Sequence, residues 1–306
     1  MALKEKLKNL LTAGVSAPET VPQDIPHGDM PGDKIRIGAE HIRKANILFP
    51  RLLEELARTG KDRAVVSVYG GSGVGKSEIA SLLAWRLQEA GIGSYVISGD
   101  NYPRRIPLYN DAERLRVFRV AGLQGLVAGG AYSDGVQEVL SKLWAAETDP
   151  DPALRGEYPW LEVYQRHGRA ALTDYLGTGA EQDFDELNAI LSAFRSGASA
   201  CWLKRMGRTE EERWYSQVDF AGVEVLILEW THGNSPFLTQ VDIPVLLNST
   251  PEETREHRRL RARDSKTDSP FTTMVLEIEQ AKLDAQARTS RLAISKGGAL
   301  LDPAAL

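Results

Sequence analysis

The sequence has only one cysteine, Cys201, among its 306 residues. A single cysteine excludes an intrachain disulfide and a zinc site built from cysteines. Basic residues are not in excess, because 37 lysines and arginines stand against 42 aspartates and glutamates, a formal net charge of -5. Nucleic-acid binding requires a basic face that neutralises phosphates. We therefore expect no nucleic-acid partner.

Long hydrophobic runs are absent as well. Crossing a bilayer takes roughly 18 or more apolar residues in succession. The opening MALKEKLKNLLTAG also lacks the uninterrupted apolar core of a signal peptide. These absences predict a soluble cytoplasmic protein without a membrane partner. What is present, 42% apolar and 26% charged residues, is ordinary globular composition and excludes a largely disordered chain.

Residues 1–60 are predicted to form an N-terminal segment ahead of the main fold. Residues 3–11 place four leucines on one helical face, which predicts an amphipathic helix docked on its own protein or on a partner subunit. A partner subunit would make a homodimer, and a membrane surface is the alternative use of such a helix. Four prolines between residues 16 and 36 predict an extended linker, and a helix should follow over 39–59.

The chain then alternates between strand and helix patterns. A β-rich run at 64–69, a helical pattern that ends at residue 91 and a second run at 94–98 form a βαβ unit. Such units build parallel sheets that are covered on both faces. Later apolar runs predict further strands at 223–228, 243–248 and 291–295, and helices at 252–263 and 272–288. We therefore predict an α/β fold with a mostly parallel sheet flanked by helices.

Residues 106–220 interrupt this alternation. The interruption is mostly helical in pattern, with helices expected at 112–120, 135–146, 159–176 and 184–195. We interpret it as an inserted helical cap that selects a substrate over the carboxyl edge of the sheet, with a separate second domain as the alternative. On this division, residues 61–105 and 221–306 form the core.

A phosphate-binding motif follows the first strand of the βαβ unit. Residues 70–77 read GGSGVGKS and fit G-x-x-x-x-G-K-[ST] without a mismatch. Glycines in such a loop let backbone N–H groups turn toward phosphate oxygens at the N-terminus of a helix. We expect the nucleotide to be bound by Gly71, Ser72, Gly73, Val74, Gly75, Lys76 and Ser77. Lys76 would reach the terminal phosphates and Ser77 would contact Mg²⁺. A glycine-rich turn that matches by chance is the alternative.

Charged residues follow the second strand of the unit. Asp100 lies where ligands bind in a parallel sheet, and its carboxylate could take the proton of an attacking hydroxyl. A turn or helix-capping aspartate is the other interpretation. Arg104 and Arg105 would suit an anionic substrate, since guanidinium groups bind carboxylates and phosphates through two hydrogen bonds. Surface charge explains them equally well.

Further candidates lie in the last third of the chain. Glu229 ends an apolar strand, where burial without a partner would be costly, and a Mg²⁺ contact would supply that partner. A surface glutamate is the alternative. His232 lies just beyond it and would meet a substrate hydroxyl. Arg259 and Arg263 are four residues apart, so one helical face would close them over the phosphates, unless the helix is merely solvated.

The order of these pieces resembles the uridine kinase and phosphoribulokinase group of P-loop kinases. In that group the strand after the P-loop ends in an Asp that acts as a general base, and an aromatic residue follows closely. Asp100 and Tyr102 match this arrangement. Further on, the group has an Asp/Phe-rich segment, which 183–187 resembles, and a helix ending near Gly, which 193–197 resembles. The polar hairpin of the group is similar to 202–205, its strand ending in Glu to 225–229, and its arginine lid to 258–264. Trp230, where the group usually has Gly, and the long insertion depart from it.

The resemblance implies a P-loop NTPase fold and an ATP- and Mg²⁺-dependent kinase. The acceptor would be a hydroxyl of a small metabolite such as a nucleoside, sugar, sugar phosphate or other hydroxy compound. Asp100 would be the general base, Ser77 and Glu229 would serve the metal, and Tyr102 would contact the substrate. Two alternatives stay open: a small-molecule kinase resembling adenylylsulfate kinases, and a nucleotide-dependent switch or binding protein without kinase activity.

Overall fold

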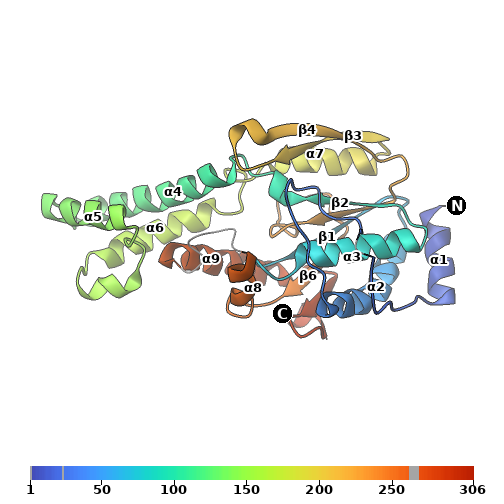
Figure 1. Cartoon of the computed structure of the whole chain (residues 1–306). Helices are drawn as coiled ribbons and strands as arrows, with labels where there is room; N and C mark the ends of the chain where they lie inside the picture. The colour runs from blue at the N-terminus through green and yellow to red at the C-terminus, as the bar shows by residue number, and fades with distance from the viewer. Residues whose placement is uncertain (1, 23, 262–268) are drawn as a thin grey trace.

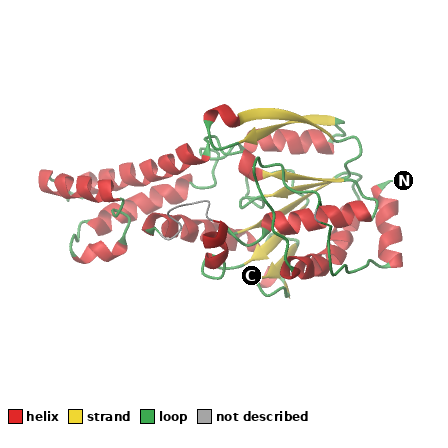
Figure 2. Cartoon of the chain, in the orientation of Figure 1, coloured by secondary structure: helices red, strands yellow, loops and turns green. Residues whose placement is uncertain are grey.

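The computed structural model describes residues 2–22, 24–261 and 269–306. Its main sheet has the strand order β2-β5-β1-β6-β7-β8, and every neighbouring pair is parallel except β7 and β8. The strands are β1 (Ala64–Gly70), β2 (Ser94–Ser98), β5 (Val225–Glu229), β6 (Ile243–Asn248), β7 (Leu292–Ser295) and β8 (Leu300–Leu301). The predicted α/β architecture, a mostly parallel sheet flanked by helices, is confirmed (Figures 1 and 2).

One face of the sheet is covered by α1 (Leu3–Ala13), α2 (Ala39–Thr59) and α3 (Lys76–Glu89). Because successive strand residues point to opposite faces, Val66 and Val68 of β1 join the apolar core under these helices. Leu3 and Leu7 of α1 are buried in the same core, and Lys6 forms an ion pair with Glu224 at 2.6 Å. The amphipathic N-terminal helix therefore docks on its own chain.

The opposite face is covered by α7 (Phe184–Arg195), by the antiparallel hairpin of β3 (Ala200–Met206) and β4 (Arg213–Asp219), and by α9 (Pro270–Ala287). Val65 of β1 packs with Phe184 and Leu203 on this side. The last part of the expected cap, from α7 through the hairpin, therefore belongs to the layer that covers the sheet.

The rest of the insertion projects away from the sheet (Figure 1). It consists of α4 (Pro107–Ala128), α5 (Asp134–Ala146) and α6 (Leu161–Tyr175), with α4 packed against α6. This projection, which we call the cap, packs on the core through α9, where Met274, Val275 and Ile278 share an apolar cluster with Phe118. No helix among the described residues is long and apolar enough to cross a membrane.

Short elements complete the chain. They are α8 (Arg255–Arg261) and the 3₁₀ turns η1 (Gly99–Asn101), η2 (Pro152–Gly156), η3 (Glu210–Glu212) and η4 (Pro303–Ala305). The proline-rich stretch between α1 and α2 holds neither helix nor strand in its described residues, as predicted. It runs along α2 and α3, where Asn46 donates a hydrogen bond to the carbonyl of Pro18 at 2.8 Å. We call residues 24–38 the strap.

Strand order brings three distant segments together at the carboxyl edge. In the parallel register, Glu229 of β5 lies beside Ser98 of β2 on one side and beside Val68 of β1 on the other. The turn that carries Asp100 leaves β2, and the phosphate loop leaves β1. These segments are therefore neighbours although more than 120 residues separate Glu229 from Asp100.

Candidate active site

The phosphate loop forms a tight connection from β1 to the N-terminus of α3. Gly73 has a φ of +77°, and a Cβ there would lie 3.0 Å from Cγ of Arg258, so conformation and space both favour glycine. Lys76 begins α3, and its ammonium group donates to the carbonyl of Gly71 at 3.0 Å. The loop therefore has the strand-turn-helix context that the motif requires.

Glu229 is buried at the edge of the sheet, with 4% of its surface exposed. Its two carboxylate oxygens accept hydrogen bonds from the hydroxyl groups of Ser98, at 2.7 Å, and Ser77, at 3.3 Å. Burial and the negative charge of Asp100 raise the pKa of Glu229 to about 8, while the charge of Lys76 opposes this rise. Its sequence-based alternative, an exposed surface glutamate, does not describe this position.

The donor atoms at this position fit a magnesium ion. Mg²⁺ prefers oxygen ligands and is commonly held by one or two protein groups together with substrate phosphates and waters. Ser77 and Glu229 supply a hydroxyl and a carboxylate next to one another, and among the described residues the buried carboxylate accepts hydrogen bonds from hydroxyl groups alone. Within the described residues no cluster of three or more His, Cys, Asp or Glu could hold a metal by itself. An ion shared with nucleotide phosphates agrees with both observations.

Asp100 lies in η1, directly beyond β2, and is exposed. Burial raises the pKa of both Glu229 and Glu279, the charge of Asp100 adds to the rise, and the charge of Lys76 opposes it. Asp100 and Lys76 therefore lie in one electrostatic environment, with Asp100 open to solvent.

Trp230, which follows Glu229 where the uridine kinase group usually has Gly, packs against Gly99. A Cβ at Gly99 would lie 2.0 Å from Cγ of Trp230, which no side chain could tolerate without a shift of the indole. Trp230 is 2% exposed and packs on the ring of Phe184. The indole therefore fills the space beneath the Asp100 turn and supports it from below.

The residues after Asp100 face the protein more than a ligand. Tyr102 is fully buried in the core, with the ammonium of Lys204 5.1 Å from its ring centre. Arg104 donates to the carbonyl of Gly179 at 2.6 Å, and Arg105 donates to the hydroxyl of Tyr175 at 3.1 Å. Both arginines thus tie the turn to the end of the cap.

His232 is buried below the last turn of the cap. A Cβ at Gly177 would lie 2.9 Å from its ring, and burial lowers the pKa of His232 to about 4, so the imidazole is neutral at pH 7. Glu181 lies close enough to oppose this lowering, and it accepts hydrogen bonds from the Gly177 amide at 2.6 Å and from Arg114 at 2.5 Å. His232 therefore lies where cap and core meet.

The arginine helix contributes a different residue from those expected. Arg258 lies over Gly73 of the phosphate loop, and its guanidinium donates to the Thr254 hydroxyl at 2.6 Å. Arg259 is exposed. Arg263 lies outside the described residues. Of the arginines described in α8, Arg258 is therefore the one that lies over Gly73 of the phosphate loop.

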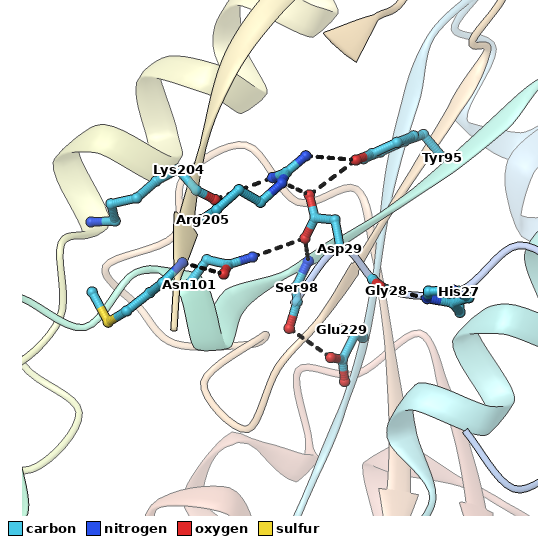
Figure 3. Close-up of polar contacts among 10 residues, drawn as sticks. His27, Gly28, Asp29, Tyr95, Ser98, Asn101, Lys204, Arg205 and Glu229 are labelled. Carbon is cyan, nitrogen blue, oxygen red and sulfur yellow. Dashed lines mark hydrogen bonds and ion pairs between the residues drawn. The ribbon is translucent and has the colours of Figure 1, made fainter. Parts of the chain in front are cut away.

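Several residues of the site had no role in the sequence-based prediction. Ser98, Arg114 and Glu279 became neighbours of the predicted groups only through folding. Asp29 of the strap also reaches the carboxyl edge, where it accepts a hydrogen bond from the Ser98 amide at 2.8 Å (Figure 3). Ser98 was detectable as a polar residue at a strand end, whereas Asp29 lies in a stretch without periodicity.

Comparison with known proteins identifies a partial relative. The chain is 36% identical over 261 residues to the bifunctional alpha-galactosidase/sucrose kinase AgaSK of Mediterraneibacter gnavus. The match covers 85% of this chain and 23% of that protein, so the chain spans less than a quarter of the relative's length. No protein-family model matches the chain.

Two solved structures show weaker likeness. A candidate fructose transport system kinase from a Silicibacter strain matches with a TM-score of 0.45 and 16% identity, covering 78% of this chain and 94% of that one. A candidate uridine kinase from Bacillus stearothermophilus matches with a TM-score of 0.40 and 15% identity, covering 74% and 91%. Because these scores are low, the fold is defined here by the chain's own strand order and register.

Proposed function

We propose that this protein is an ATP- and Mg²⁺-dependent kinase that phosphorylates a hydroxyl group of a small sugar. The observation that carries the proposal is the meeting of a phosphate loop, an exposed Asp100 and a buried Glu229 at one edge of the sheet. Each supplies a part that phosphoryl transfer needs: phosphate binding, a base and a metal ligand. The relative named as a sucrose kinase supports a sugar as the acceptor.

In the proposed reaction, the amides of the phosphate loop and Lys76 hold the triphosphate of ATP. The acceptor hydroxyl attacks the γ-phosphorus, its proton passes to the Asp100 carboxylate, and the bond from the γ-phosphorus to the β–γ bridging oxygen breaks to release ADP. Ser77 and Glu229 would hold Mg²⁺, which when bound neutralises charge on the phosphates. Arg258, and the expected Arg259 and Arg263, would add positive charge from the lid.

Pairing of the arginines favours an acceptor without charge. Arg104 forms an ion pair with Asp183 at 3.4 Å, and Arg105 forms one with Glu113 at 3.7 Å. Arg114 is held by Glu181. An anionic acceptor would have to displace these carboxylates, whereas hydroxyl groups of a neutral sugar can share their oxygens. We therefore favour a neutral sugar over the anionic substrate that the adjacent arginines suggested.

The experiment that tests the proposal measures ADP release with Mg²⁺ and ATP against a panel of acceptors. Sucrose is tested first, followed by other neutral sugars, their phosphates, nucleosides and adenylylsulfate. We expect a neutral sugar to raise turnover well above the rate without acceptor, with a phosphorylated sugar as product in mass spectrometry. Turnover that rises only with a sugar phosphate or adenylylsulfate would refute the choice of acceptor.

The competing function is a nucleotide-dependent switch that hydrolyses ATP slowly and signals through its cap. The projecting cap is the feature that favours it, because such a surface could change partners with the nucleotide state (Figure 1). Tight nucleotide binding with no acceptor-dependent turnover across the panel would favour the switch over the kinase.

A further inference from the structure

The strap crosses the carboxyl edge beside Glu229, the metal ligand proposed above (Figure 3). Gly28 is buried, and a Cβ there would lie 3.5 Å from Oε1 of Glu229 and 3.8 Å from Cβ of Ser98. Backbone from the proline-rich stretch therefore runs beside the proposed metal ligand, with space between them for about one methyl group. A simple linker between two helices would not need to pass so close.

The carboxylate of Asp29 holds both sides of the Asp100 turn. Oδ1 accepts hydrogen bonds from the backbone amide of Ser98 at 2.8 Å and from the side-chain amide of Asn101 at 3.0 Å. These two donors flank Asp100 in the sequence, one before η1 and one at its last residue. A change in the position of Asp29 would therefore move the backbone that carries Asp100.

The other oxygen of Asp29 connects the strap to the hairpin. Oδ2 accepts from Nη1 of Arg205 at 2.7 Å and from the hydroxyl of Tyr95 at 3.1 Å. Only 7% of the Asp29 side chain and 9% of the Arg205 side chain are exposed. The Asn101 side chain also accepts from the amide of Met206 in β3 at 3.0 Å, so turn, hairpin and strap form one network.

A carboxylate has about four lone-pair sites, and here four donors occupy them. Charge-assisted hydrogen bonds of this kind are roughly twice as strong as neutral ones. Two of the four donors, from Ser98 and Asn101, lie on either side of Asp100. The other two, from Tyr95 and Arg205, lie away from the proposed catalytic residues. The two halves of the carboxylate can therefore be tested separately.

We infer that Asp29 is a positioning residue for phosphoryl transfer, which fixes the turn that presents Asp100 to the acceptor. The inference rests on the proposed kinase function. Misplacing a reacting group by about 1 Å can cost roughly 100-fold in rate. Loss of the Asp29 carboxylate should therefore lower kcat while the phosphate loop keeps its affinity for ATP.

The test compares two substitutions at Asp29 under saturating ATP, Mg²⁺ and the acceptor that the wild type uses. Asp29→Ala removes all four acceptor contacts and should lower kcat by about 10- to 100-fold, with little change in the Kd for ATP. Asp29→Asn loses the ion pair with Arg205 but keeps a carbonyl oxygen for Ser98 and Asn101, so it should recover most of kcat. Asp24→Ala, at an exposed strap residue, is the matched control and should behave as wild type.

A double-mutant cycle with Asp100 separates positioning from general stability. If Asp29 acts through Asp100, then adding Asp29→Ala to Asp100→Asn should change kcat by no more than about twofold. If Asp29→Ala does not fold, Asn101→Ala replaces it in the same cycle.

Two results would overturn the inference by itself. In the first, the wild type is active and Asp29→Ala and Asp29→Asn lower kcat by the same factor. In the second, Asp29→Ala lowers kcat as much in the Asp100→Asn protein as in the wild type. Either result means that Asp29 acts through the stability of the hairpin. A wild type without acceptor-dependent turnover would instead refute the proposed function, and the inference with it.

Discussion

Replacement of Glu229 by glutamine tests how the carboxyl edge is built. Glutamine has nearly the same shape, and its amide can keep hydrogen bonds to the hydroxyl groups of Ser98 and Ser77. What it removes is a group that can become negatively charged at a position that is 4% exposed. In the protein without metal and nucleotide, this change should therefore increase stability, and the increase should depend on pH.

The sign follows from the pKa of Glu229, which is raised from the ordinary 4.5 to about 8. Between these values the folded protein holds a proton that the unfolded chain releases, so the free energy of unfolding of the wild type falls as pH rises. The full cost, reached above pH 8, is roughly 5 kcal/mol as an upper value. Glu229→Gln avoids this cost, so its advantage should grow by roughly 3 kcal/mol between pH 5.5 and 8.5.

Thermal unfolding at these two pH values, without metal or nucleotide, measures the effect. We expect the Tm of Glu229→Gln to exceed that of the wild type by several degrees more at pH 8.5 than at pH 5.5. Mg²⁺ with ATP should then raise the Tm of the wild type more than that of the variant. Glu138→Gln, at an exposed residue of the cap, is the control and should show neither effect. An equal Tm shift at both pH values would refute the electrostatic account of Glu229.

Three further substitutions, with Gly135→Ala as a control for the third, test other parts of the site. Asp100→Asn should leave the Kd for ATP near normal and lower acceptor-dependent turnover by about 10²- to 10⁴-fold, and near-normal turnover would remove Asp100 from the role of base. Lys76→Met should weaken ATP binding by roughly 10- to 100-fold in calorimetry, because the charged hydrogen-bond donor proposed to contact phosphate is lost. Gly99→Ala should cost about 1–3 kcal/mol in denaturant unfolding, since its Cβ would overlap Trp230. Gly135→Ala, in a helix with open space around it, should stabilise the protein, and similar effects of the two glycine changes would contradict the packing account.

The elements of the core were predictable because their patterns are local. The strand at 64–69 became β1 (Ala64–Gly70), the strand at 94–98 is β2, and the helix at 184–195 is α7. Helix ends were less predictable: a helix expected at 112–120 extends over Pro107–Ala128, and Gly122 and Gly125 beyond the periodic stretch still lie against Tyr164 and His167 of α6. Burial across an interface, which the sequence does not display, sets such boundaries.

The layout of the insertion was not predictable in the same way. Its helices could be expected from periodicity, yet nothing local separates the part that projects from the part that covers the sheet. That separation depends on which apolar faces meet: α7 packs with β1 and β5, and α6 packs with α4 and α9. Such pairings are decided by long-range contacts.

The phosphate loop, Asp100 and Glu229 could be identified in the sequence because each lies at or just beyond the end of a strand, and the carboxyl ends of parallel strands share one edge. Their partners could not. Asp29 lies in a proline-rich stretch without periodicity, and it meets Ser98 and Arg205 only because the strap crosses the finished sheet. Short-range patterning therefore specifies the strands, the helices and the phosphate-loop motif. The burial of Glu229 and the network around the Asp100 turn exist only in the folded protein, where hydrogen bonds join residues more than 60 positions apart.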